Sequence, residues 1–243
     1  MHQSYNNFII VLGLFIYVFL IYIFNLINIK DIKFLKKFSL YLCGIINIRK
    51  QIFWEVFKFI YFFIIGILPS IYFCIRSRMQ IKYISSNINV LTSIAVFIIA
   101  FVAILEITFF VVIVVVEVLM GKNSRNELSK VSWIKFNNKY PIYTGIIRPI
   151  ITALLETILF YGIFFYILNN ICNFSIAICL ILLAVLYTFS KILLVRNKEQ
   201  ALMYGTWAFM LNIVGGMLYI YSTSILLTLM LYMLYMFIIA FKE

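Results

Sequence analysis

Long apolar runs separated by short polar stretches are the dominant pattern along the 243 residues of this chain. A membrane-spanning helix needs roughly 20 apolar residues. Because the bilayer core offers no water to backbone polar groups, each run of this length is expected to be a helix. The pattern therefore predicts an all-α polytopic membrane helical bundle of about seven transmembrane helices, within a range of six to eight, at 8–29, 52–75, 92–119, 143–168, 174–195, 201–221 and 223–241.

A shorter apolar run at 38–48 interrupts this pattern between the first two long runs. It is too short to span, and lysine and arginine residues flank it on both sides. These features are typical of a helix that lies in the membrane interface. The sequence therefore predicts N-terminal membrane helices with an interfacial segment over 1–88, followed by a helical core over 89–243.

Composition excludes a soluble protein. Hydrophobic residues make up 65% of the chain, charged residues only 12%, and the mean hydropathy is +1.10; these values lie far outside the range of soluble domains. The net charge of +12 comes from basic residues between the apolar runs, which is typical of membrane loops. The predicted partner is the lipid bilayer, and no nucleic acid is expected.

The distribution of basic residues predicts the orientation in the membrane. Cytoplasmic loops carry an excess of Lys and Arg, so the loops richest in them are placed inside, and the opposite side receives only Arg76, Arg78 and Lys82. This places the N-terminus outside and the C-terminus inside. The abundance of Ile, Phe, Asn and Lys suggests an A+T-rich genome, and we expect a bacterial plasma membrane protein. The residues placed inside are Lys30, Lys33, Lys36, Lys37, Arg49, Lys50, Lys122, Arg125, Lys130, Lys135, Lys139, Arg196, Lys198 and Lys242.

Four ionisable residues stand out inside the predicted spans, where each costs on the order of 3 kcal/mol unless it is paired or hydrated. Glu106 and Glu117 are eleven residues apart, or three helical turns, so both are expected to point from one face into the bundle. Contacts with a neighbouring helix or the interface explain them more simply than a functional site. Glu156 and Lys191 lie at similar depths on successive helices, so they are predicted to form an ion pair. With Glu117, this pair is expected to open toward one inner-leaflet cavity.

Two segments resemble a known family. "LLETILFYGIFF", beginning at Leu154, is similar to the Glu-Glu-x-x-x-Arg-Gly segment of the CAAX-protease and bacteriocin-processing (CPBP, or Abi) membrane proteins, with Glu156 at the first Glu position. "GMLYIYSTSI", beginning at Gly216, resembles the passage that leads into the last catalytic helix of that family. The resemblance covers about 140–240. It implies a hydrolytic site in which Glu and His side chains activate water or hold a metal.

The chain departs from the family at most active-site positions. Thr157 replaces the second Glu and Tyr161 replaces the Arg. The Phe-x-x-x-His helix reads "YTFSK", with Tyr187 and Lys191, and the His-x-x-x-Asn helix reads "YMLYM" from Tyr232. The single histidine of the chain is His2, so the matched positions hold neither a general base nor a metal site. No metal or other cofactor is predicted.

Three functions remain open on the sequence. The favoured one is a non-catalytic CPBP-like membrane protein that binds a peptide or another membrane protein, in bacteriocin self-immunity or as an accessory of peptide processing or export. The first alternative is a divergent CPBP intramembrane endopeptidase that acts through Glu156. The second is a transporter subunit whose buried charges carry ions or protons. The candidate site residues are Glu156 as the catalytic position, and Glu106, Glu117, Tyr161, Tyr187, Lys191 and Tyr232 as cavity or ion-pair residues.

Overall fold

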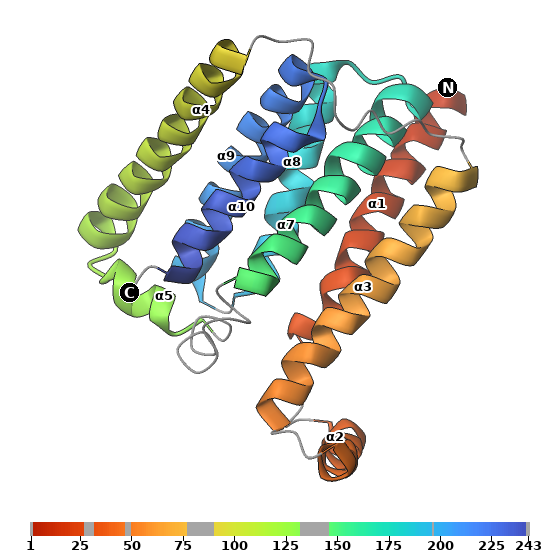
Figure 1. The fold of residues 1–243 in the computed structure, drawn as a ribbon, viewed down its shortest axis with the longest axis vertical. Helices are drawn as coiled ribbons and strands as arrows, with labels where there is room; N and C mark the ends of the chain where they lie inside the picture. Colours follow the sequence, from red (N-terminus) through yellow and green to blue (C-terminus); the bar gives the residue numbers. More distant parts are fainter. Residues whose placement is uncertain are drawn as a thin grey trace. The chain divides into compact units, whose positions relative to one another are not determined.

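A computed structural model describes the protein at residues 2–26, 32–46, 50–76, 90–131, 146–195 and 197–241 (Figure 1). Over these ranges the elements are helices and no strand is present, so the all-α prediction is confirmed there. The chain divides into two compact units, Met1–Met79 and Gln80–Glu243. The boundary predicted after residue 88 lies outside the described residues.

The first unit contains α1 (His2–Leu26), α2 (Lys33–Ile46) and α3 (Lys50–Arg76). Pro69 lies inside α3 and lacks the N–H that would bond to the carbonyl of Ile65. The Tyr17 hydroxyl of α1 donates to that carbonyl at 2.9 Å, and it lies 3.0 Å from the Gly66 carbonyl. The two long helices are therefore joined where the proline interrupts the helical hydrogen bonds.

The helix α2 covers the run predicted to be interfacial but begins earlier, at Lys33. Its 14 residues are fewer than a span requires. The side chains of Lys33, Lys36 and Lys37 are exposed. The interfacial position of α2 stays a prediction.

The second unit begins with α4 (Val90–Phe110), which continues into the π-helix η2 (Val111–Leu119). The short α5 (Ser124–Ser129) follows. Next comes a continuous helical stretch made of α7 (Arg148–Thr157), η4 (Ile158–Phe164) and η5 (Ile167–Ile171). The unit ends with α8 (Ile176–Ile192), α9 (Lys198–Ser222) and α10 (Ile225–Phe241).

The helix α9 contacts α4, α8 and α10, and α10 also contacts α7. These contacts place α9 and α10 at the centre of the second unit, as Figure 1 shows. The core contains large aromatic side chains that are fully buried. Phe160 and Tyr187 meet edge to face with ring centroids 5.1 Å apart, and the rings of Tyr187 and Tyr232 are 5.3 Å apart.

The short helix α5 is held against the start of α9. Gln200 donates a hydrogen bond to the backbone carbonyl of Glu127 at 2.9 Å, and Lys130 forms an ion pair with the Glu127 carboxylate. The hydrogen bond from Lys130 lowers the pKa of the Glu127 carboxyl below its ordinary value. The loop after η2 and the start of α9 therefore lie at the same end of this unit.

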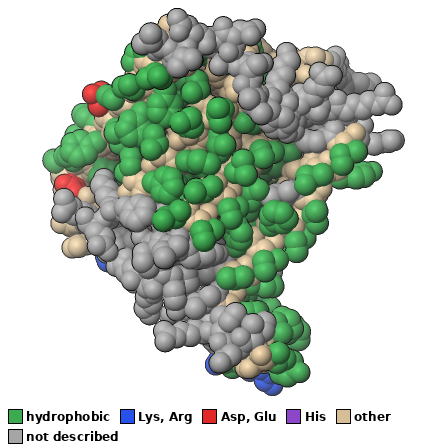
Figure 2. Space-filling view, in the orientation of Figure 1, with side chains coloured by type: hydrophobic (Ala, Val, Ile, Leu, Met, Phe, Trp, Pro, Cys, Tyr) green, Lys and Arg blue, Asp and Glu red, His purple; other side chains and the backbone are tan. Residues whose placement is uncertain are grey.

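In the described part of the chain, four helices are long and apolar enough to cross a membrane: Asn6–Ile23, Thr92–Leu119, Arg148–Ile171 and Lys198–Ser222. Shorter apolar stretches occur at Val56–Tyr72, Ile176–Ile192 and Ile225–Ile238. Hydrophobic side chains cover much of the visible surface (Figure 2). These features indicate a membrane-embedded helical protein.

Candidate functional site

The centre of the second unit holds a buried ion pair between α7 and α8. Lys191 donates to one carboxylate oxygen of Glu156, and the Tyr187 hydroxyl donates to the other at 2.9 Å. Glu156 is 0% exposed and Lys191 1%. The structure thus contains the pair expected from the depths of the two residues.

The sequence of α8 explains why a tyrosine and a lysine reach the same carboxylate. Tyr187 and Lys191 are four residues apart, so they lie one turn apart on the same helix face. The ammonium of Lys191 also lies 4.8 Å from the centroid of the Tyr187 ring, within the range of a cation–π contact. One face of α8 therefore satisfies both oxygens of Glu156.

A second polar cluster joins η4, α9 and α10. The Tyr161 hydroxyl donates to the backbone carbonyl of Asn212 at 2.6 Å and lies 3.1 Å from the Tyr232 hydroxyl. The side-chain amide of Asn212 donates to the Tyr232 hydroxyl at 2.9 Å. Because the Tyr232 ring also contacts the Tyr187 ring, the two clusters are neighbours. The structure brings together five predicted site residues: Glu156, Tyr161, Tyr187, Lys191 and Tyr232.

Asn212 and Thr228 belong to this region but were not predicted as site residues. Thr228 donates to the Gly215 carbonyl at 2.9 Å, which adds a bond between α9 and α10. Both side chains are 0% exposed. Asn212 and Thr228 could have been identified as polar residues within apolar runs, because such residues form hydrogen bonds between helices in a membrane.

Two glycines of α9 permit this close approach. A Cβ atom on Gly215 would lie 3.0 Å from Tyr232 Cε2 and 3.1 Å from the Tyr161 hydroxyl oxygen. A Cβ atom on Gly216 would lie 2.3 Å from Leu180 Cδ2. The two tyrosine hydroxyls can therefore reach Asn212 because α9 has no side chain at these points.

The prediction that the side chains of Glu106 and Glu117 point into the bundle is wrong. Both side chains are exposed, and Glu117 accepts a hydrogen bond from the Ser124 hydroxyl at 2.5 Å. The face of α4 that is buried carries Ala100 and Ile104 instead. Glu117 also does not share a cavity with Glu156 and Lys191, because it lies on the surface near α5 while the other two are fully buried.

The geometry around Glu156 limits its chemistry. A general base must reach the proton that it removes, directly or through one water, but Glu156 is fully buried, with Lys191 on one oxygen and Tyr187 on the other, so water has no access to it. Lys191 offers only donors, and a metal requires lone pairs. The residues at the matched positions therefore do not fit a metal. Across the described ranges, no group of three His, Cys, Asp or Glu side chains could hold a metal ion.

The chain was compared with known proteins and families. No curated protein and no solved structure matches it. Residues 94–243 match a family of unknown function, DUF5968, and this range is more than half of the chain. Nothing in these comparisons connects the chain with the CPBP family, so that resemblance stays a prediction. The chain belongs to the DUF5968 family.

Proposed function

We propose that this chain is a non-catalytic integral membrane protein that acts by binding a peptide or another membrane protein. The observation that carries the proposal is the state of Glu156, which is fully buried and bonded through both oxygens to Lys191 and Tyr187. Water cannot reach a carboxylate in these surroundings for activation, and removing it alone would leave Lys191 as an unpaired buried charge.

The proposal includes a CPBP-like origin with an altered site. The positions that the resemblance assigns to the family's Glu and two His residues are Glu156, Lys191 and Tyr232 in this chain. Their convergence on neighbouring clusters supports the proposal, because a shared fold would bring these positions together. By the same resemblance, the expected role is bacteriocin self-immunity or assistance in peptide processing or export.

The test of the proposal is a search for proteolysis by the full chain in liposomes. Purified protein is incubated with a mixture of prenylated C-terminal peptides and leader peptides, and the products are identified by mass spectrometry. We expect no cleavage that depends on Glu156, because its carboxylate is fully buried and paired with Lys191.

The control is Glu117→Gln, which removes an exposed carboxylate of the same unit. Each variant is compared at equal amounts of folded protein, measured by size-exclusion chromatography. Cleavage that survives Glu117→Gln and disappears in Glu156→Gln would establish the intramembrane endopeptidase instead.

We also propose seven spans in a bacterial plasma membrane, with the N-terminus outside and the C-terminus inside. The distribution of charge in the second unit supports this orientation. Lys122, Lys130 and Lys198 lie at the end where α5 is bonded to the start of α9. The connections 172–175 and 223–224, at the other ends of α8 and α9, contain no Lys or Arg.

Labelling of single cysteines tests this orientation. In a chain that lacks the four native cysteines, Asn123→Cys is expected to react with a membrane-impermeant maleimide only after the cells are permeabilised. Asn170→Cys, at the opposite end, is expected to react in intact cells. Both positions are exposed. The reverse labelling pattern would show that the orientation is inverted.

A further inference from the structure

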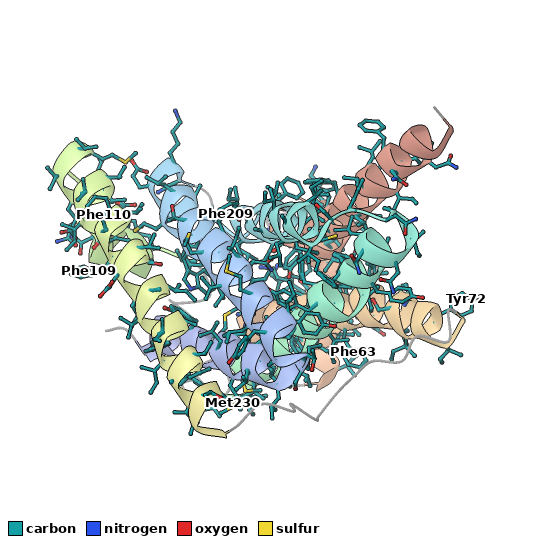
Figure 3. All side chains as sticks on the ribbon, turned by 90° about the horizontal axis from the view of Figure 1, so that it is seen from above. Phe63, Tyr72, Phe109, Phe110, Phe209 and Met230 are labelled. Carbon is teal, nitrogen blue, oxygen red and sulfur yellow. The ribbon has the colours of Figure 1, made fainter. Side chains whose placement is uncertain are left out.

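The helix α4 has two distinct faces. Ser93, Ala100 and Ile104 are buried where α4 contacts α9 and α10. Phe109 and Phe110 point away from the other helices (Figure 3), and they are 63% and 64% exposed. A continuous exposed stripe runs along this outer face through Thr92, Ala95, Ile99, Val102, Glu106 and Phe109.

The spacing of the stripe fits a contact with another helix. Its residues follow one another at alternating intervals of three and four along the sequence, which is the spacing that keeps one side of a helix facing a partner helix. The small side chain of Ala95 and the large side chain of Phe109 give the stripe an uneven surface suited to side-chain packing. The stripe therefore has the form of a helix-docking surface.

Glu106 belongs to this stripe and lies at the middle of the membrane span. It follows Thr92 by 14 residues and precedes Leu119 by 13 in a span of 28 residues. At about 1.5 Å per residue, roughly 20 Å separates it from either end, too far for its side chain to reach an interface. A carboxylate at this depth requires a polar or charged partner.

Three other acidic side chains of this unit have partners that Glu106 lacks. Glu156 is paired with Lys191, Glu127 with Lys130, and Glu117 accepts a hydrogen bond from Ser124. Glu106 makes no hydrogen bond or ion pair with any residue that the structure describes. The stripe therefore presents one unneutralised carboxylate, surrounded by Val102 and Phe109, to whatever lies beside α4.

We propose that the outer stripe of α4 docks a transmembrane helix of a partner protein that carries Lys or Arg at the middle of its span, opposite Glu106. Charge complementarity favours this partner over a second copy of the chain, because a two-fold contact between two α4 stripes brings like carboxylates together. This inference rests on the proposed function, which is the binding of a membrane partner. It identifies the surface that binds the partner and the charge that the partner carries.

The experiment uses the full chain in liposomes and two synthetic membrane-spanning probes of about 20 leucine and alanine residues. One probe has a single central lysine and the other has leucine there. Energy transfer between a labelled probe and the labelled protein measures binding. We expect the lysine probe to bind about ten-fold more tightly than the leucine probe.

Variants identify the residue responsible. Glu106→Leu is expected to abolish the difference between the two probes, and Glu117→Gln to leave it unchanged. Glu106→Lys is expected to transfer the preference to a probe with a central glutamate. Because Glu106 is exposed and does not stabilise the fold through any described contact, these variants should fold normally.

Three results would overturn the proposal. The first is equal binding of the two probes, which includes the case that neither binds. The second is a preference for the lysine probe that survives Glu106→Leu. The third is self-association of the protein in the absence of any probe that is lost when Glu106 is replaced. The last result would identify a second copy as the occupant. None of these measurements involves cleavage or Glu156, so a failure here is distinguishable from a failure of the proposed non-catalytic function.

Discussion

Replacing Lys191 with methionine is expected to lower the free energy of unfolding of the protein by about 3 to 5 kcal/mol. The change leaves the Glu156 carboxylate fully buried without its counter-charge, although the Tyr187 hydroxyl still donates to it. Glu156→Gln should have a comparable effect, because it leaves a buried ammonium without its counter-charge. Denaturation of the purified protein in detergent micelles, followed by circular dichroism, measures both changes.

The double variant separates a structural pair from a functional one. Replacing both partners removes both buried charges, so Glu156→Gln combined with Lys191→Met should recover most of the lost stability. Lys198→Met serves as the control, since Lys198 is exposed and its loss should change stability little. If both single variants unfold like the unmodified protein, the pair is not retained for stability.

The second large effect is expected at Gly215, where an added methyl group would meet three side chains. Its Cβ would lie 3.0 Å from Tyr232 Cε2, 3.1 Å from the Tyr161 hydroxyl oxygen and 3.2 Å from Thr228 Cγ2. Overpacking of this kind typically costs about 1 to 3 kcal/mol. We therefore expect Gly215→Ala to lower the free energy of unfolding by that amount in the same denaturation experiment.

Gly162→Ala is the matched control for this prediction. Gly162 is also a buried helical glycine of the second unit, but an added Cβ would meet only Ile158 Cγ2, at an ordinary 3.9 Å. Its substitution should not destabilise the protein, because alanine is the better helix former. Equal losses from Gly162→Ala and Gly215→Ala would show that the contacts with the tyrosines are not the cause.

The hydrophobic pattern predicted where long helices lie, although only four helices of the described residues are long and apolar enough to cross a membrane. The run predicted at 201–221 is the helix Lys198–Ser222, and the run at 174–195 is Ile176–Ile192. The Glu156–Lys191 pair was also predictable, because depth and the antiparallel order of two neighbouring helices restrict which buried charges can meet. The helix positions and the ion pair both depend on the position of a residue along a helix axis, and this position follows directly from the residue's place in the sequence.

The directions of side chains around a helix axis were harder to predict. In Thr92–Leu119, apolar residues such as Ile99 and Ile104 occupy opposite faces, so no polar face indicates which side contacts the bundle. Glu106 and Glu117 were therefore assigned to the interior on the cost of exposing charge to lipid, whereas packing of α4 and η2 against α9 places them outside. Asn212 was missed for a related reason: its role depends on Tyr161, a residue 51 positions away.

The bond between Gln200 and Glu127 has a consequence for the biogenesis of the protein. The two residues are 73 positions apart, and a ribosome adds about 5 to 20 residues per second. The partner of α5 is therefore synthesised roughly 4 to 15 s after α5 itself. During this interval α4 lacks the helix that later buries Ala100 and Ile104; because lipid tails are as apolar as these side chains, lipid covers this face of α4 until α9 displaces it.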